Sequence, residues 1–410
     1  MLKADWFKNV TALITGTVIG QFIPIALQPV LRRVFSPEEF GVFAVFASVY
    51  GIISVASALR FELAINNPEK DQDAFGLVWL SLWINLGVSV LTCATLIIAR
   101  AIGLEGMVLT VTMIIGIPLA VLFSGIFRAL NYWLIRKEQF KLSARNKVYR
   151  RAAQGLAQLI TGFLKVPSGL IYSEVVGHAA NVGSAAIKLK NSFRSYPILG
   201  KGHLKAIATR YKEFALYSSG PAVLNAFCML FPSIIILEKF GLEATGQYDL
   251  SRTLLMIPMA LVGVSVSQIV LQQTNKLKDR PKERNRFYGQ LLMVLLAISI
   301  PIPPFLLLFG EPIFAFFFGF EWVVAAQIST VLSFSFALKA VVSPFSMILV
   351  AFEKLKLAAY WQVLYAGFIG LIFVWEFTSF EHFITFFTVG EVLVYVIYGL
   401  IILSVVRKQN

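Results

Sequence analysis

Several ionisable side chains of this sequence lie inside long apolar stretches, where they could bind an ion or exchange a proton. Glu174 and His178 are four residues apart and therefore share one face of a helix, and Asp249 and Glu391 are carboxylates in comparable surroundings. A carboxylate is easier to protonate away from water, and histidine titrates near neutrality. We therefore interpret these four residues as candidates for ion or proton coupling. A satisfied hydrogen-bonded pair between helices is the alternative for Glu174 and His178.

Three cations lie in similar stretches and could bind an anion. A charge near the centre of a bilayer costs about 2.5–3.5 kcal/mol, so each charge that is kept there is a candidate functional residue. We interpret Lys339, Arg252 and Arg128 as substrate-binding residues that line a cationic lumen. The alternatives are a structural pair or a side chain that reaches the membrane surface for Lys339, a pair with Asp249 for Arg252, and contact with lipid headgroups for Arg128.

The usual catalytic and metal-binding patterns do not occur. Asp71 and Asp73 form a D-x-D pair on a short loop without a soluble domain around it, so we interpret them as solvated residues. Cys93 and Cys228 lie in apolar segments, which argues against a disulfide or a zinc site. The sequence also lacks a phosphate-binding loop and a zinc-protease motif. We expect no enzyme activity, no cofactor and no bound metal.

The composition indicates a membrane protein. Of the 410 residues, 58% are hydrophobic and only 14% are charged, whereas soluble proteins carry about 25% charged residues. A helix of about 20 apolar residues spans a bilayer, and the sequence predicts twelve such spans. Their approximate ranges are 10–31, 41–59, 75–98, 107–130, 148–166, 168–187, 213–237, 248–271, 287–308, 323–350, 357–375 and 383–405.

The distribution of charge predicts the orientation of these spans. The net charge of +14 is concentrated in the loops on the side of the N-terminus, as is typical of cytoplasmic loops. We therefore expect both termini in the cytoplasm and no nucleic-acid partner. The basic connector over residues 188–212 is expected to attract anionic membrane lipids.

A repeated motif indicates that the chain is built from two like halves. The segment Phe35–Gly41 is partly repeated at Phe240–Gly246. The distance between the two copies is half the length of the 410-residue chain. With six spans per half, the two halves enter the membrane from the same side and form a parallel repeat. We expect an all-α polytopic membrane protein with two six-helix lobes, residues 1–187 and 213–410, around a central cavity.

The first span is expected to be a bent helix that shows a polar face to the cavity. Gln21 and Gln28 lie seven residues apart, two turns along one helical face, and Pro24 interrupts the helix between them. Proline in a helix removes a backbone hydrogen bond and kinks the axis. A membrane helix tolerates such a kink where neighbouring helices or water satisfy the freed groups.

A series of short motifs in the N-terminal half resembles a known family. The chain is similar, over about residues 9–160, to bacterial polysaccharide and O-antigen flippases of the multidrug/oligosaccharidyl-lipid/polysaccharide exporter superfamily. The motifs are Asn9–Thr11, Gly16–Gln21, Pro29–Arg33, Ser36–Gly41, Leu59–Ile65 and Asn131–Lys141. The second half resembles this family mainly in its topology.

The resemblance implies a function and a location. It implies alternating access that moves a polyprenyl-diphosphate-linked oligosaccharide, such as a lipopolysaccharide O-antigen, capsule or exopolysaccharide repeat unit, from the inner to the outer leaflet of the bacterial inner membrane. Arg60 and Glu62 belong to a family-like Arg-Phe-Glu motif and are expected to form an intracellular gate or a structural pair. A polysaccharide assembly machinery is a further expected partner. The alternative is an ion-coupled drug or solute antiporter on the same scaffold, which would favour carboxylates facing the lumen. A membrane polymerase or ligase is disfavoured by the short outer loops.

Overall fold

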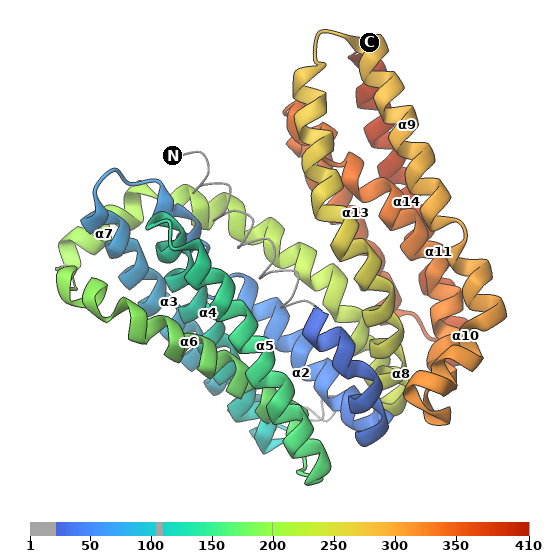
Figure 1. The fold of residues 1–410 in the computed structure, drawn as a ribbon, viewed down its shortest axis with the longest axis horizontal. Helices are drawn as coiled ribbons and strands as arrows, with labels where there is room; N and C mark the ends of the chain where they lie inside the picture. Colours follow the sequence, from blue (N-terminus) through green and yellow to red (C-terminus); the bar gives the residue numbers. More distant parts are fainter. Residues whose placement is uncertain (1–21, 104–109, 199, 410) are drawn as a thin grey trace. The chain divides into compact units, whose positions relative to one another are not determined.

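The protein folds into helices that are joined by turns. The computed structural model describes residues 22–103, 110–198 and 200–409, and these ranges contain no strand (Figure 1). Eight stretches of the described residues are long and apolar enough to cross a membrane. The chain divides into two compact units, Met1–Phe231 and Pro232–Asn410.

The N-terminal unit is a bundle in which α4 packs against α2, α3 and α6, and α5 packs along α6. The short helix η1 (Phe61–Asn66) connects α2 to α3. A second short helix, η2 (Phe214–Ser218), precedes α8 (Ser219–Lys276). The other helices of this unit are residues 22–34, α2 (Pro37–Val55), α3 (Asp71–Ala101), α4 (Val111–Arg136), α5 (Phe140–Phe163), α6 (Gly169–Ser195) and α7 (Lys201–Arg210).

The C-terminal unit is arranged around α11, which packs against α9, α10 and α14, while α13 packs against α14. It contains the remainder of α8 and the short helix η3 (Phe320–Trp322). Its other helices are α9 (Pro281–Ser299), α10 (Ile302–Phe318), α11 (Val323–Phe345), α12 (Met347–Ala351), α13 (Leu355–Val374) and α14 (Phe380–Lys408).

The repeated motif marks a sharp break between two helices in each unit. In the first copy, the Ser36 hydroxyl accepts a hydrogen bond from the backbone of Glu39, and the Glu39 carboxylate accepts one from the backbone of Ser36 at 2.9 Å. This capping box starts α2. In the second copy, half the chain length later, Gly241 interrupts α8 with φ 85° and ψ −174°. Glycine is suited to this position because the backbone is left-handed in φ there.

Close approach of helices holds the N-terminal unit together. Gly125 of α4 lies so near α3 that a Cβ atom on it would fall 2.0 Å from Oδ1 of Asn85. Asn85 is fully buried and donates to the carbonyl oxygen of Leu122 at 2.8 Å. Nearer the η1 end of α3, Phe75 and Trp133 pack edge to face with ring centroids 4.8 Å apart. These contacts fix α3 against α4, the helix that carries Arg128.

The expected bounds of the ninth span are wrong. Instead of one helix over residues 287–308, the chain forms α9 and α10, which together make an apolar stretch from Pro281 to Phe318. The break between them lies at Pro301, followed by Pro303 and Pro304. Proline carries no backbone N–H and is favoured in the first turn of a helix, so this cluster of prolines suits the start of a new helix, α10.

Candidate functional site

The N-terminal unit contains a buried polar network at the carboxylate of Glu174. Arg150 of α5 lies 2.7 Å from Oε1 of Glu174 through its NH2 group, and Gln154 donates to the other carboxylate oxygen. His178, one turn further along α6, lies 3.1 Å from the same Oε1 atom. Tyr50 of α2 completes the network with its hydroxyl 2.9 Å from Nε2 of His178. The network therefore joins three helices, α2, α5 and α6.

The Nε2 atom of His178 stands between groups of opposite hydrogen-bonding character. The guanidinium of Arg150, 3.0 Å away, can only donate, while the Glu174 carboxylate can only accept. A proton on Nε2 favours the bond to Glu174, and a bare Nε2 favours the bond from Arg150. The state of a single proton thus decides which contact is made.

The C-terminal unit contains a second network at the carboxylate of Glu391. The Nζ atom of Lys339 and the hydroxyl of Tyr365 each lie 2.5 Å from Oε1 of Glu391. Ser335 donates to Oε2 at 2.9 Å. Lys339 also lies 5.5 Å from the ring centroid of Tyr395, within range of a cation–π interaction. The pair is dry, since only 6% of Lys339 and 1% of Glu391 is exposed.

Lys339 is therefore ion-paired in the structure. It also lines a cavity of about 400 Å³ between α8, α9 and α11, together with Ser267, Gln268 and Ser343. Arg252 of α8 lies near enough for its charge to act on Lys339. The C-terminal unit thus places two cations near one carboxylate and one cavity.

Arg128 donates hydrogen bonds to the C-terminal end of α2, and it pairs with no carboxylate at hydrogen-bonding distance among the described residues. It donates to the carbonyl oxygen of Ser54 and, at 2.9 Å, to the hydroxyl of Ser57. Ser54 lies in the last turn of α2 and Ser57 lies just beyond it, so Arg128 connects α4 to the C-terminal end of α2. Side chains of Arg60 and Glu62 make no ion pair with each other among the described residues.

Glu62 is nevertheless in the electrostatic field of both arginines. It lies in η1, outside the spanning helices, with 1% of its surface exposed. Burial raises the pKa of the Glu62 carboxyl, against the opposing charges of Arg128 and Arg60. Arg60 precedes η1 in a left-handed conformation with φ 62°. The Arg-Phe-Glu motif therefore forms a buried turn beside Arg128.

The remaining predicted residues are placed as follows. Gln21 lies outside the described residues. Pro24 and Gln28 lie in the helix over residues 22–34, and Gln28 accepts a hydrogen bond from Nε of Arg32 at 2.9 Å. Asp249 is on α8, three residues before Arg252. No three His, Cys, Asp or Glu side chains in the described ranges lie close enough together to hold a metal ion.

Sequence reasoning missed the partners of the two carboxylates. Arg150 lies within the expected fifth span, one turn from Gln154 on a single face of α5, but was not among the candidate residues. Tyr365 and Ser335 are polar residues within apolar helices and carry no further signal. The sequence did indicate that Glu174 and Glu391 correspond to each other, since each lies in the last predicted span of its half.

This chain resembles known proteins in its sequence. A family model described as polysaccharide biosynthesis protein matches residues 30–327. The succinoglycan biosynthesis transport protein ExoT of Rhizobium meliloti (strain 1021) is 24% identical over 343 residues, which are 81% of this chain. The same alignment covers 65% of ExoT, so the chain spans less than two thirds of the length of that relative.

Solved structures share the fold. The lipid II flippase MurJ in an inward closed conformation superposes with a TM-score of 0.68 at 14% identity, covering 98% of this chain and 90% of MurJ. An outward-facing MATE family multidrug resistance transporter of the MOP superfamily has a TM-score of 0.59 at 13% identity, covering 98% and 96% of the two chains. Both likenesses extend over nearly the whole chain and confirm the expected fold class.

Proposed function

Because the chain belongs to the polysaccharide biosynthesis protein family, as the match over residues 30–327 shows, we propose that it is a flippase for a lipid-linked oligosaccharide. It would move a polyprenyl-diphosphate-linked repeat unit from the inner to the outer leaflet of a bacterial cytoplasmic membrane by alternating access. The family match, which agrees with the resemblance of the N-terminal motifs, is the observation that carries this proposal. The transporter fold and the succinoglycan transport relative support it.

The charges of the cargo suit the cations of the C-terminal unit. A diphosphate carries about two negative charges, which Lys and Arg meet with charge-assisted hydrogen bonds. In the described state Lys339 is engaged by Glu391. We propose that the diphosphate competes with Glu391 for Lys339, assisted by Arg252, so that cargo binding opens the pair. An outward step down a potential negative inside gains about 2.3 kcal/mol per charge per 100 mV.

The network at Glu174 is proposed to couple transport to a proton or another cation. Its geometry supports this role because protonation of His178 exchanges a hydrogen bond between α5 and α6 for one within α6. Glu391 and Asp249 are the corresponding candidates in the C-terminal unit. Arg60, Glu62 and Arg128 are proposed to act as an inner gate, since they meet at the turn after α2.

The orientation and the division of the chain remain part of the proposal. Both termini would lie in the cytoplasm, which the excess of Lys and Arg in the loops on that side supports. Residues 1–187 and 213–410 would form the moving lobes, with residues 188–212 as the connector that meets anionic lipid. Enzymes of polysaccharide assembly would supply the cargo and take it up on the other side.

A drug or solute antiporter is the alternative, and the MATE structures resemble this chain in fold alone. Such a transporter would need carboxylates free to bind organic cations. Both carboxylates discussed here are engaged by basic side chains, Glu174 by Arg150 and Glu391 by Lys339. The alternative therefore has less support than the flippase.

The test is complementation of a deletion strain with wild type, Lys339→Ala and the exposed-lysine control Lys356→Ala, each checked for expression. Cell-surface glycan and lipid-linked repeat units on each leaflet are measured. We expect deletion to abolish surface glycan and to trap single repeat units on the cytoplasmic face, and Lys339→Ala to reproduce this defect. Units trapped on the outer leaflet would instead indicate a polymerase. Normal export by Lys339→Ala would assign Lys339 to structure.

A further inference from the structure

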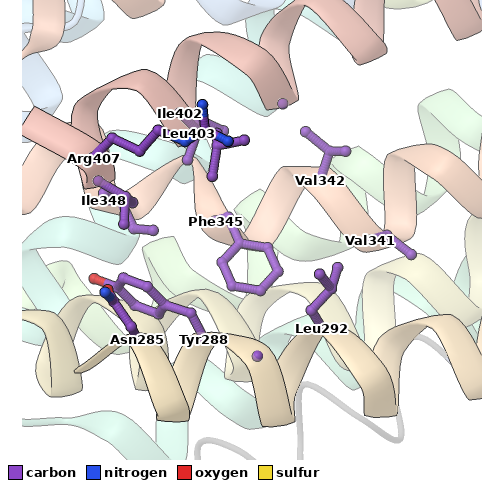
Figure 2. A pocket seen from close by; sticks show the side chains of 13 residues that line it. Asn285, Tyr288, Leu292, Val341, Val342, Phe345, Ile348, Ile402, Leu403 and Arg407 are labelled. Carbon is purple, nitrogen blue, oxygen red and sulfur yellow. The ribbon is translucent and has the colours of Figure 1, made fainter. Parts of the chain in front are cut away.

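A groove on the C-terminal unit has the chemistry of a lipid site. It encloses about 420 Å³ between α9, α11 and α14, and its floor is formed by buried aliphatic side chains such as Val342, Ile348 and Ile402. Leu292 and Leu403 on its rims are 40% and 43% exposed. Figure 2 shows these residues around the ring of Phe345, which also lines the groove. The groove therefore has an apolar floor and is open to the surroundings.

The sequence of both rim helices is patterned for this groove. On α9 the lining residues are Asn285, Tyr288, Gly289 and Leu292, and on α14 they are Gly399, Ile402, Leu403 and Val406. Each set repeats the spacing i, i+3, i+4, i+7, which places all four residues on one helical face. A Cβ atom added to Gly289 would meet nothing within 4 Å. The glycine leaves room on the open side of the groove.

One end of the groove is polar and positively charged. Asn285 and Arg407 lie at the same end, whereas Leu292 and Val341 lie at the opposite end (Figure 2). The Arg407 side chain makes no hydrogen bond or ion pair with another described residue, and it is exposed. Lys408 follows it, and exposed Arg286 lies on the first turns of α9. The positive end of the α9 dipole adds to this field.

We propose that this groove binds an anionic phospholipid, with an acyl chain along the aliphatic floor and the phosphate at Arg407. A single hydrocarbon chain matches the apolar floor, and an anionic headgroup matches the cationic end. The surrounding leaflet supplies phospholipid in excess, which favours occupancy by mass action. The proposal is independent of the cargo, because neither Lys339 nor Glu391 lines this groove.

The test is native mass spectrometry of the purified full chain titrated with phosphatidylglycerol, phosphatidylcholine or undecaprenyl phosphate. One basic residue near an anionic headgroup contributes about 1 kcal/mol, which is about fivefold in affinity. We expect phosphatidylglycerol to bind at least about fivefold more tightly than phosphatidylcholine. Arg407→Gln should abolish this preference, while the neighbouring control Lys408→Gln should keep most of it.

A second pair of variants tests the groove itself. Gly289→Trp should fill it and remove the bound lipid, and Gly289→Leu should weaken binding with less disturbance. Gly370→Trp on α13 is the matched control, since a Cβ atom there also meets nothing within 4 Å. Equal effects of Arg407→Gln and Lys408→Gln, or of the two tryptophan variants, would overturn the proposal. So would tighter binding of undecaprenyl phosphate than of phosphatidylglycerol in the same groove.

Discussion

The pair between Lys339 and Glu391 should be strongly coupled in the stability of the C-terminal unit. Each side chain is almost completely buried, and their charged atoms lie 2.5 Å apart. Removing one partner of a buried pair leaves an uncompensated charge and costs about 3–5 kcal/mol. Removing both charges is often close to neutral. We therefore expect Lys339→Met and Glu391→Gln each to destabilise the protein by about 3–5 kcal/mol, and the double variant to be near wild type.

The assay is a double-mutant cycle on the purified protein in detergent, followed by thermal or denaturant unfolding. These costs correspond to a coupling energy of about 6–10 kcal/mol, whereas interhelical hydrogen bonds in membrane proteins average about 0.6 kcal/mol. Lys356→Met, at an exposed position on α13, controls for the loss of a lysine. Single variants that each cost under about 1 kcal/mol and add in the double variant would refute the reasoning. That outcome would mean that water from the adjacent cavity reaches the charges.

Two further predictions concern the N-terminal unit. Gly125→Ala should destabilise it by about 1–3 kcal/mol, because the added methyl group meets Asn85 at 2.0 Å; Gly87→Ala, with open space around its Cβ, should leave the unfolding midpoint unchanged or raise it. Glu62→Gln should raise the unfolding midpoint in alkaline buffer and match wild type in acid. The pKa of Glu62 is raised by burial, so its protonated form stabilises the fold at low pH, and that stability falls as the pH rises through the raised pKa. A variant whose midpoint parallels wild type at every pH would contradict this account.

The helical architecture could be predicted from sequence because a bilayer requires apolar runs of a nearly fixed length. The residues at which the helices begin and end could be predicted less well. α3 begins at Asp71 and α14 continues to Lys408, because polar residues extend a helix beyond the membrane without a hydropathy signal. The break between α9 and α10 was missed, although Pro301, Pro303 and Pro304 could have indicated it.

The candidate site could be predicted only in part. The contact between Glu174 and His178 follows from their spacing on one helix. The contact between Lys339 and Glu391 joins α11 to α14, and a single sequence carries no information on which helices meet. For the same reason the contact between Arg150 and Glu174 could not be predicted. Local periodicity thus gives pairs within a helix, whereas pairs between helices depend on packing.

The sharp turn at Gly241 also limits which proteases, antibodies or inserted peptides could reach or fit this part of the chain. One residue with an extended ψ joins two long helices, so the turn offers no loop of the kind that proteases cut or antibodies recognise. Of Gly241, Leu242 and Glu243, only Glu243 is exposed. An epitope tag or reporter inserted at this turn would have to separate two packed helices. The accessibility of this turn is therefore better measured with a small thiol reagent on the variant Glu243→Cys than with an inserted peptide.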